Sequence, residues 1–313
     1  VVDPDSVLDK QGADAVRWYF YSGSAPWLPS RFYEDAVSES QRKFMGTLWN
    51  TYSFYVLYAN IDSFDPSKHA LDYENLPVMD RWLLSRLNTL VATVDDNLEN
   101  YRITESARAI SDFTDELSNW YVRRGRERYW GTELTKDKVD AYMTLYTALV
   151  TLSKVIAPFV PFLAEEIYQN LVRNIYPDAP VSVHLCDFPV SDGSMIDAEL
   201  ERNMDTVLAA VSLGRTCRNT ANIKNRQPLP EIYICSGEKK DLPKEFLELV
   251  EDELNVKKVG FTDNPEQFVS YRFKPQLRTC GKKFGKLVPK IGAALSEIDG
   301  RAAMAELNAT GRL

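Results

Sequence analysis

The chain has 313 residues, of which 44% are hydrophobic and 26% are charged; this composition excludes a disordered chain, and the length predicts two domains, with room for part of a third. Its formal net charge of −8 excludes indiscriminate nucleic-acid binding and allows such binding only where basic residues gather locally, because a polyanion is repelled by net negative charge. No apolar run approaches the roughly 20 residues that span a bilayer, and the N-terminus lacks the pattern of a signal peptide, so we expect a cytoplasmic protein without membrane contact.

The first 35 residues predict one short helix, over residues 14–22, and then a loop, GSAPWLPSRF. The glycine and two prolines of this loop cannot continue a helix. The piece is too small to fold alone, and it begins without a Met. We therefore interpret residues 1–35 as the C-terminal end of a preceding part of a longer protein, and residue 1 as an internal cut in that protein.

Residues 36–190 predict a helical bundle. Aromatic side chains keep helical spacing over residues 39–60, and a second helix begins near Asp80, where leucines and valines recur at intervals of three and four. A third helix runs from an expected N-cap at Thr104 to an arginine-rich segment, and a fourth spans residues 138–156. Short loops between such helices favour a bundle architecture.

The sequence changes character after the fourth helix. Pro158 and Pro161 interrupt the helical pattern, because each costs a backbone hydrogen bond. Beyond Tyr176 a proline-rich linker with one predicted strand, VSVHL, places a domain boundary at residue 190. Residues 191–313 then predict a smaller α/β domain. We expect helices over residues 197–221 and 244–254, strands over residues 231–235, 256–261 and 268–273, and a final helical region beyond residue 273.

The cysteines and histidines predict no metal or catalytic centre. The four cysteines lie at least 18 residues apart, which provides neither a metal knuckle nor a disulfide framework. The only two histidines, His69 and His184, are isolated from each other, and we interpret both as structural. We expect four buried thiols: Cys186, Cys217, Cys235 and Cys280.

Three basic stretches stand out in this acidic chain, at residues 120–130, 213–230 and 271–290. The first contains four arginines and one acidic residue, and the other two contain no Asp or Glu. Local clusters of this kind are the places where an acidic protein binds a polyanion. They are therefore the candidates for a nucleic-acid interface.

The first basic stretch predicts an exposed stripe on one helix face. At about 100° per residue, the positions i, i+4, i+7 and i+11 share a face, and these are Asn119, Arg123, Arg126 and Trp130. Guanidinium groups bind phosphate and stack on bases, indole offers a stacking surface, and an amide can read a base edge, so the stripe suits an unpaired loop. The alternative is that the arginines merely solvate the helix, and Gly125 can break the register.

The other two stretches carry simpler predictions. The segment LGRTCRNTANIKNRQPLP is also interpretable as the solvated end of a helix. In GKKFGK, Gly281 and Gly285 would let the backbone approach a phosphate, although the sequence does not match a P-loop and such glycines occur in plain turns. The residues predicted to contact nucleic acid here are Arg215, Arg218, Arg226, Lys282 and Lys283.

Several segments resemble a known family. The passage VVDPDSVLDKQGADAVRWYFYSGSAPWLPSRF resembles the one that follows the KMSKS loop in class I aminoacyl-tRNA synthetases of the Ile/Val/Leu group. NWYVRRGRERYW, IAPFVPFLAEEIY, LGRTCRNTANIKNRQPL and FKPQLRTCGKKFGKLV are similar to isoleucyl-tRNA synthetase in its eukaryote-like form. The match covers essentially the whole chain. GADAVRW and APFVPF are shared across the group, whereas the arginine-rich and C-terminal segments separate Ile from Val and Leu.

The resemblance implies the tail of a catalytic part over residues 1–35, an anticodon-binding helical bundle over 36–190 and a C-terminal α/β domain over 191–313. It implies that the chain holds the anticodon arm of tRNA(Ile) while the acceptor end reaches a distant active site, in a ligase that joins isoleucine to tRNA with ATP. These residues contain no HIGH-like or KMSKS motif and no editing domain, so we predict no catalytic residue, metal or cofactor in this chain. The expected partners are tRNA(Ile) and the remainder of the same polypeptide.

Two alternatives stay open at this point. One is the same role in a valyl- or leucyl-tRNA synthetase, since amino-acid choice is not readable from these residues. The other is a helical module whose basic segments contact acidic protein surfaces.

Overall fold

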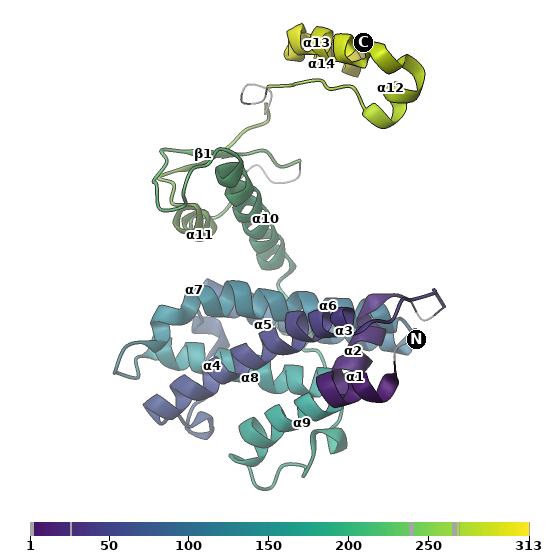
Figure 1. The fold of residues 1–313 in the computed structure, drawn as a ribbon. Helices are drawn as coiled ribbons and strands as arrows, with labels where there is room; N and C mark the ends of the chain where they lie inside the picture. Colours follow the sequence, from purple (N-terminus) through teal and green to yellow (C-terminus); the bar gives the residue numbers. More distant parts are fainter. Residues whose placement is uncertain (1–2, 26, 238–240, 265–267, 269, 313) are drawn as a thin grey trace. The chain divides into compact units, whose positions relative to one another are not determined.

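The computed structural model describes residues 3–25, 27–237, 241–264, 268 and 270–312. The chain divides into two compact units, residues 1–205 and 206–313 (Figure 1). The first unit is helical, and the second combines helices with a small sheet. This confirms the predicted mainly α class with a smaller α/β part.

In its described residues the first unit contains nine complete α-helices and the start of a tenth, and shorter π and 3-10 turns connect several of them. The α-helices are α1 (Pro4–Gln11), α2 (Ala13–Gly23), α3 (Glu34–Gln41), α4 (Thr47–Asp62), α5 (Val78–Glu99), α6 (Ile103–Asp115), α7 (Arg123–Gly125), α8 (Lys136–Ile156) and α9 (Pro161–Tyr168). The π turns are Arg42–Gly46, Glu116–Val122 and Gln169–Arg173; the 3-10 turns are Pro66–Lys68, Tyr73–Asn75, Arg126–Tyr129, Val183–Leu185 and Gly193–Met195.

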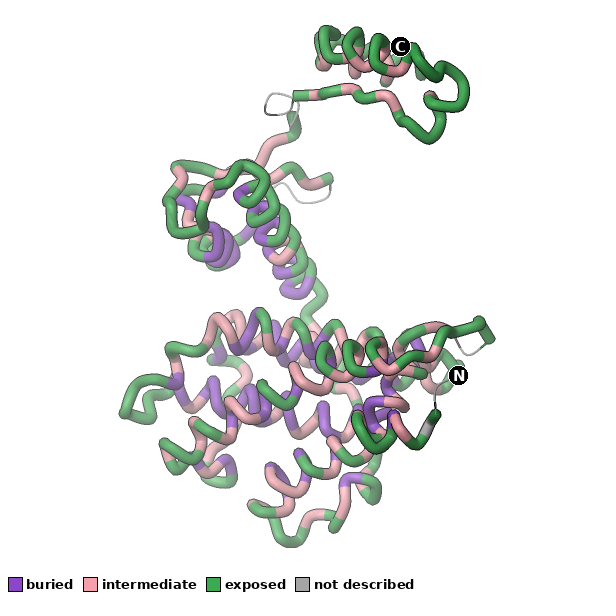
Figure 2. Tube along the Cα trace, in the orientation of Figure 1, coloured by how far each residue is buried: buried purple, intermediate pink, exposed green. Residues whose placement is uncertain are grey.

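Helix α8 lies at the centre of the bundle, where it packs against α4, α5 and α9. Fourteen of its 21 residues are buried, so it is covered on almost all sides (Figure 2). Helix α5 buries most of the leucines and valines whose spacing predicted it, among them Leu83, Leu87 and Val94. Burial of these apolar faces is the main source of stability in such a bundle.

Several predicted boundaries hold, and some are wrong. Helix α1 was not predicted, although Pro4 at its first position is a typical start signal. The predicted N-cap at Thr104 is wrong: the helix begins after Arg102, and the buried hydroxyl of Thr104 donates to the Ser24 carbonyl oxygen at 3.4 Å. The break predicted at the two prolines is confirmed, since Pro161 starts α9.

The strand predicted for VSVHL is also wrong. Residues Val183–Leu185 form a 3-10 turn. The Glu165 carboxylate accepts hydrogen bonds from the Val183 backbone N–H and the Ser182 hydroxyl, both at 2.9 Å, and the Ser182 hydroxyl accepts from the His184 N–H. These side-chain bonds hold the backbone in a turn, where an alternating pattern alone predicted a strand.

The second unit contains the C-terminal part of α10, a two-stranded sheet and further helices. Strands β1 and β2 are parallel, with Ile232 opposite Val259 and Ile234 opposite Phe261, and α11 connects them as a crossover. The elements are α10 (Ala198–Thr220), β1 (Ile232–Ile234), α11 (Lys244–Leu254), β2 (Val259–Phe261), α12 (Leu277–Phe284), the 3-10 turn Gly285–Leu287, α13 (Val288–Glu297) and α14 (Gly300–Thr310).

Two further predictions fail. The strand expected over residues 268–273 is absent from residues 268 and 270–273, and residue 269 lies outside the described part. None of the four cysteines is buried: Cys217 and Cys235 are exposed, and Cys186 and Cys280 are intermediate. Cys217 on α10 and Cys235 directly after β1 both line a hollow of the second unit, where no side chain covers them fully.

The division between the two units falls after residue 205, within α10. The segment just after residue 190 is bonded to α5 of the first unit, because the Ser191 hydroxyl donates to the Asn88 carbonyl oxygen at 2.9 Å and the Asp192 N–H donates to the Asn88 side chain at 2.8 Å. The domain boundary at residue 190 stays a prediction. No helix in the described part of the chain is long and apolar enough to cross a membrane.

The packing of α10 on α11 generates a first prediction. A Cβ at Gly214 would lie 2.4 Å from Leu254 Cδ1, and Leu254 is buried. Gly214→Ala is therefore expected to destabilise the second unit by about 1–3 kcal/mol, measured by urea unfolding followed with amide exchange in α11. Gly281→Ala is the control, since nothing lies within 4 Å of its Cβ position. Equal stability of the two variants would contradict the close packing.

Candidate nucleic-acid interface

The predicted stripe is carried by an interrupted helix. Helix α6 continues into the π turn Glu116–Val122, then into α7 and the 3-10 turn Arg126–Tyr129. An α-helix, a π turn and a 3-10 turn differ in the number of residues per helical turn. The four residues of the stripe therefore do not share one helical register, and the register predicted for them is wrong. Asn119 and Arg126 are nevertheless exposed, Arg123 is partly exposed, and Trp130 is 60% exposed. The apolar residues predicted to point inward, Leu117, Trp120 and Tyr121, are buried.

A buried ion pair fixes the 3-10 turn. Asp80 on α5 is fully buried, and its two carboxylate oxygens accept hydrogen bonds from Arg128 at 2.8 and 2.7 Å. The Tyr121 hydroxyl donates to the same carboxylate at 2.5 Å, and Arg128 Nε donates to Asp137 at 3.0 Å. Arg128 therefore belongs to the scaffold, although in the sequence it looks like the other arginines of the basic stretch.

The surroundings of Asp80 keep Arg128 charged and Tyr121 neutral, which are the protonation states that their hydrogen bonds to Asp80 require. Burial opposes the charged form of Arg128, but its hydrogen bonds to Asp80 and Asp137 outweigh burial and raise the pKa of the guanidinium. Burial, with the nearby Asp80 charge, raises the pKa of Tyr121 well above its usual value, so the phenol stays a neutral donor. A bidentate arginine and a phenol thus satisfy one buried carboxylate.

Neighbouring side chains fix the two ends of the turn. The buried Tyr129 hydroxyl donates to the Ala141 carbonyl oxygen at 3.0 Å, and its ring packs edge-on against Tyr142 at 4.9 Å. After Trp130, the buried Lys138 ammonium donates to the Gly131 carbonyl oxygen and pairs with a carboxylate of α4. Arg126 and Trp130 therefore extend from a backbone that is fixed on both sides.

The first half of the stripe makes local contacts. Arg123 Nε donates to the Asn119 carbonyl oxygen at 2.8 Å, and the guanidinium groups of Arg123 and Arg124 lie 5.9 and 5.5 Å from the Trp120 ring centroid. The Asn119 side-chain amide donates to Asp115. That carboxylate disfavours a phosphate at Asn119, which makes Asn119 better suited to a base edge than to the backbone of a nucleic acid.

A hollow beside Asn119 adds residues that the sequence did not indicate. It has a volume of about 700 Å³ and is lined by Arg42 and Lys43 of the π turn before α4, by Thr47 at the start of α4, and by acidic residues of α6 and of the π turn after it. Arg42 and Lys43 are exposed, and Lys43 pairs with Glu39 at 2.8 Å. Their only sequence signal was an Arg-Lys pair at the start of an aromatic helix, far along the chain from the basic stretch.

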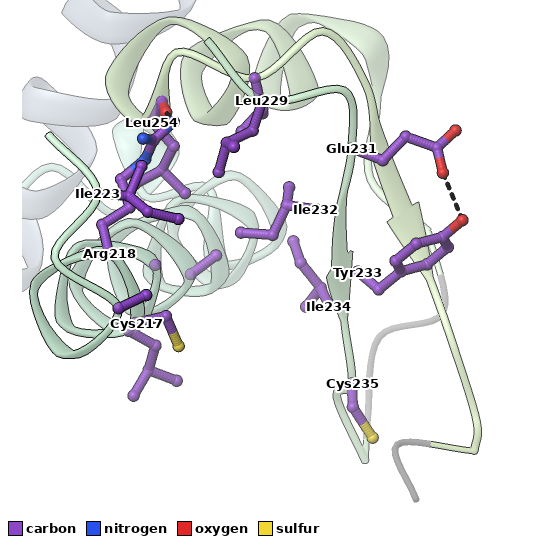
Figure 3. A pocket seen from close by; sticks show the side chains of 15 residues that line it. Cys217, Arg218, Ile223, Leu229, Glu231, Ile232, Tyr233, Ile234, Cys235 and Leu254 are labelled. Atoms are coloured by element: carbon purple, nitrogen blue, oxygen red, sulfur yellow. Dashed lines mark hydrogen bonds between the residues drawn. The ribbon is translucent and has the colours of Figure 1, made fainter. Parts of the chain in front are cut away.

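Arg218 is placed differently from its prediction. It is 5% exposed, and its guanidinium donates to four backbone carbonyl oxygens, as Figure 3 shows in part. The acceptors are Lys224, Gln227, Leu254 and Asn255. These bonds connect the end of α10 to the end of α11, so Arg218 is a structural residue and the predicted contact with nucleic acid is wrong for this position.

The remaining predicted residues of the second unit lie on its surface. Arg215 is 45% exposed at its side chain and pairs with Glu253, which reduces its positive charge. Arg226 is exposed, and so are Lys282 and Lys283 in the last turn of α12. For these exposed residues, contact with nucleic acid stays a prediction.

The second unit also contains an apolar pocket of about 330 Å³ between α10 and β1. Figure 3 shows its wall of aliphatic side chains, with Ile232 and Ile234 on one side and Cys217 on the other. The one buried charge in its lining is Arg218, whose guanidinium is already bonded to carbonyl oxygens. The pocket therefore offers packing surface and little chemistry.

Comparison with known families identifies the kind of domain that contains the exposed turn Arg126–Tyr129. A sequence model described as the anticodon-binding domain of tRNA ligase matches residues 80–234. The match begins at the buried Asp80 and includes Arg128 and the whole stripe. Residues 80–234 are an anticodon-binding domain of the tRNA ligase family.

Close relatives extend this assignment beyond the anticodon-binding domain. The isoleucine–tRNA ligase of Clostridium novyi (strain NT) is 56% identical over 96% of this chain and 28% of the relative. That of Thermus thermophilus is 45% identical over 97% of this chain and 29% of the relative. These relatives confirm the predicted resemblance to isoleucyl-tRNA synthetases. The chain spans less than a third of their length.

A solved structure gives a weaker likeness. The crystal structure of the ternary complex of Agrobacterium radiobacter K84 agnB2 LeuRS, tRNA and LeuAMS aligns with 64% of this chain and 22% of that chain. The identity is 17% and the TM-score 0.47. A likeness of this size carries no inference about the anticodon-binding domain described above.

The ion pair in the anticodon-binding domain generates a second prediction. Arg128→Met is expected to lower the free energy of unfolding by about 3–5 kcal/mol, because it leaves the buried Asp80 carboxylate without its cation. Urea unfolding monitored by circular dichroism measures the decrease. The control is Arg102→Met: Arg102 pairs with Asp96, which is 66% exposed, and such surface pairs contribute about 0–1 kcal/mol. Decreases of equal size in the two variants would contradict the scaffold role of Arg128.

Proposed function

We propose that this chain binds the anticodon arm of tRNA(Ile) and holds it in place, within a cytoplasmic ligase that joins isoleucine to tRNA with ATP. The observation that carries the proposal is the fixed turn of the anticodon-binding domain, from which Arg126 and Trp130 extend into solvent. In this proposal, the residues that bind ATP and isoleucine belong to the remainder of the polypeptide.

The chemistry of the turn suits an unpaired loop. Arg126 supplies a charge that can neutralise a phosphate, and Trp130 supplies a flat surface on which an unstacked base can lie. Because the turn is already fixed by Arg128 and Tyr129, little backbone freedom is lost when RNA binds. The local positive charge outweighs, at this place, the repulsion of a chain with net charge −8.

The contribution to the ligase reaction is positioning. A tRNA that is bound by its anticodon arm loses translational and rotational freedom, so its acceptor end meets the active site more often in a productive orientation. We propose that the first 35 residues join the catalytic part, that residues 36–190 form the anticodon-binding bundle and that residues 191–313 add further contacts through Arg226, Lys282 and Lys283.

The third prediction separates stacking from charge. Arg126→Ala, and likewise Arg123→Ala, is expected to weaken tRNA binding and to reduce the slope of log K against log salt by roughly 0.7–0.9 for each phosphate that is no longer neutralised. Trp130→Ala is expected to cost about 1–3 kcal/mol with little change in slope. Fluorescence anisotropy with labelled tRNA(Ile) transcript over a KCl series measures both quantities.

The controls test the location and the specificity. Arg102→Ala removes an exposed arginine of the same domain outside the stripe and is expected to leave affinity and slope unchanged. Transcripts that differ only in the anticodon test the amino-acid identity of the tRNA. If affinity is independent of the anticodon, or if Arg126→Ala and Trp130→Ala bind like the parent, the stripe is ordinary surface and the proposal fails.

A further inference from the structure

Two sequence segments have no part in the proposed tRNA contact, yet they bind each other directly. GADAVRW, residues 12–18, spans the start of α2, and APFVPF, residues 157–162, forms the corner between α8 and α9. More than 140 residues separate the paired positions. Their contacts are polar and complementary in charge, which indicates a specific joint between α2 and this corner.

Asp14 caps helix α9 from a distance. Its carboxylate accepts hydrogen bonds from the backbone N–H groups of Leu163 at 2.8 Å and Phe162 at 3.4 Å. The residue at the N-cap position of α9, Val160, has no side chain that could do this. Burial raises the pKa of Asp14, and the two N–H bonds oppose that effect. A carboxylate at this place also interacts favourably with the helix dipole.

Arg17 binds the other side of the same corner. Its Nε donates to the Phe159 carbonyl oxygen at 3.1 Å, and its Nη2 donates to the Pro158 carbonyl oxygen at 2.7 Å. These carbonyl groups follow the end of α8, where no further helical turn supplies a donor. One turn of α2 therefore provides a negative group for the start of α9 and a positive group for the end of α8.

Trp18 adds an apolar contact to the joint. Its ring stacks on Phe44 with centroids 3.6 Å apart, and it meets Phe159 edge-on at 6.3 Å. The side chain is 2% exposed. Polar bonds at two points and a stacked ring at a third prevent rotation of α2 on the bundle.

The segment α1–α3 also has an exposed apolar surface. Phe20, Trp27, Leu28 and Tyr33 are 53%, 77%, 55% and 52% exposed. Large exposed aromatic groups in one short segment are typical of a surface that another part of a protein covers. The segment is thus fixed to the bundle by one set of residues and exposes a second set.

We propose that Asp14 and Arg17 are positioning residues of the ligase reaction. They hold the bundle at one angle to the segment α1–α3 and, through it, to the part of the polypeptide where isoleucine is joined to tRNA. A tRNA bound by its anticodon arm is then presented in one orientation. This inference rests on the proposed function, because it needs a tRNA bound at one end and reacting at the other.

The experiment uses the intact ligase that contains this chain. The variants are Asp14→Ala and Arg17→Ala, with Asp14→Asn as the conservative change that keeps one acceptor oxygen for α9. Lys10→Ala is the matched control, because Lys10 lies in the same segment but pairs with Glu34 at the surface. Three quantities are measured: isoleucine-dependent ATP–pyrophosphate exchange, the KM for tRNA and the kcat for charging of tRNA.

We expect Asp14→Ala and Arg17→Ala to lower kcat for charging about 10- to 100-fold, as a misplacement of about 1 Å does. Exchange and the KM for tRNA should stay within about twofold of the parent, because amino-acid activation and anticodon binding are unchanged. Asp14→Asn should recover part of kcat, and Lys10→Ala should behave like the parent. In the Asp14→Ala protein, amide exchange at Phe162 and Leu163 should accelerate while that of α5 does not.

Three results would overturn the inference. An unchanged kcat in both alanine variants means that the joint does not position the tRNA. A parallel fall of exchange, affinity and kcat means that the residues only support folding. Unchanged amide exchange at Leu163 means that Asp14 does not hold α9. A KM for tRNA that is independent of the anticodon in the parent enzyme would instead overturn the proposed function, and this inference with it.

Discussion

The ion pair between Asp80 and Arg128 is the constraint on which the proposed tRNA surface depends. A carboxylate that is fully buried costs several kcal/mol unless a cation and hydrogen-bond donors satisfy it. Arg128 supplies the cation and Tyr121 supplies a further donor. The irregular turn after α7 is therefore stable only in the conformation that reaches Asp80, and in that conformation Arg126 and Trp130 are exposed. The same ion pair thus stabilises the bundle and keeps Arg126 and Trp130 exposed.

Apolar spacing predicted the long helices well, because burial of one face decides whether such a segment is helical. Helix α11 has the predicted bounds, and α5 and α8 begin within two residues of theirs. The irregular parts were not predictable in this way. The π and 3-10 turns near Arg126 depend on a carboxylate 48 residues away, and the failed strand at VSVHL depends on Glu165. A local pattern contains no information about such distant partners.

The candidate site shows the same limit at the level of single residues. Arg126, Arg128 and Arg218 look alike in the sequence, since each lies in a basic stretch next to polar neighbours. The structure exposes Arg126, pairs Arg128 with a buried acid and surrounds Arg218 with carbonyl oxygens. Sequence reasoning identified the exposure of Trp130 and of Arg126. It could not tell an exposed arginine from a scaffolding one, because that difference lies in the partner and not in the arginine.

The cap that Asp14 provides for α9 has a consequence for the order of events during synthesis. The carboxylate and the N–H groups it binds are 148 and 149 residues apart. A ribosome that adds about 5–20 residues per second needs roughly 7–30 s to make the intervening chain. During that interval Asp14 and Arg17 emerge and wait without their partners, while α5 and α6 already have sequence to pack against. The joint between α2 and the bundle therefore forms later than the contact between α5 and α6, whose residues are close together along the chain.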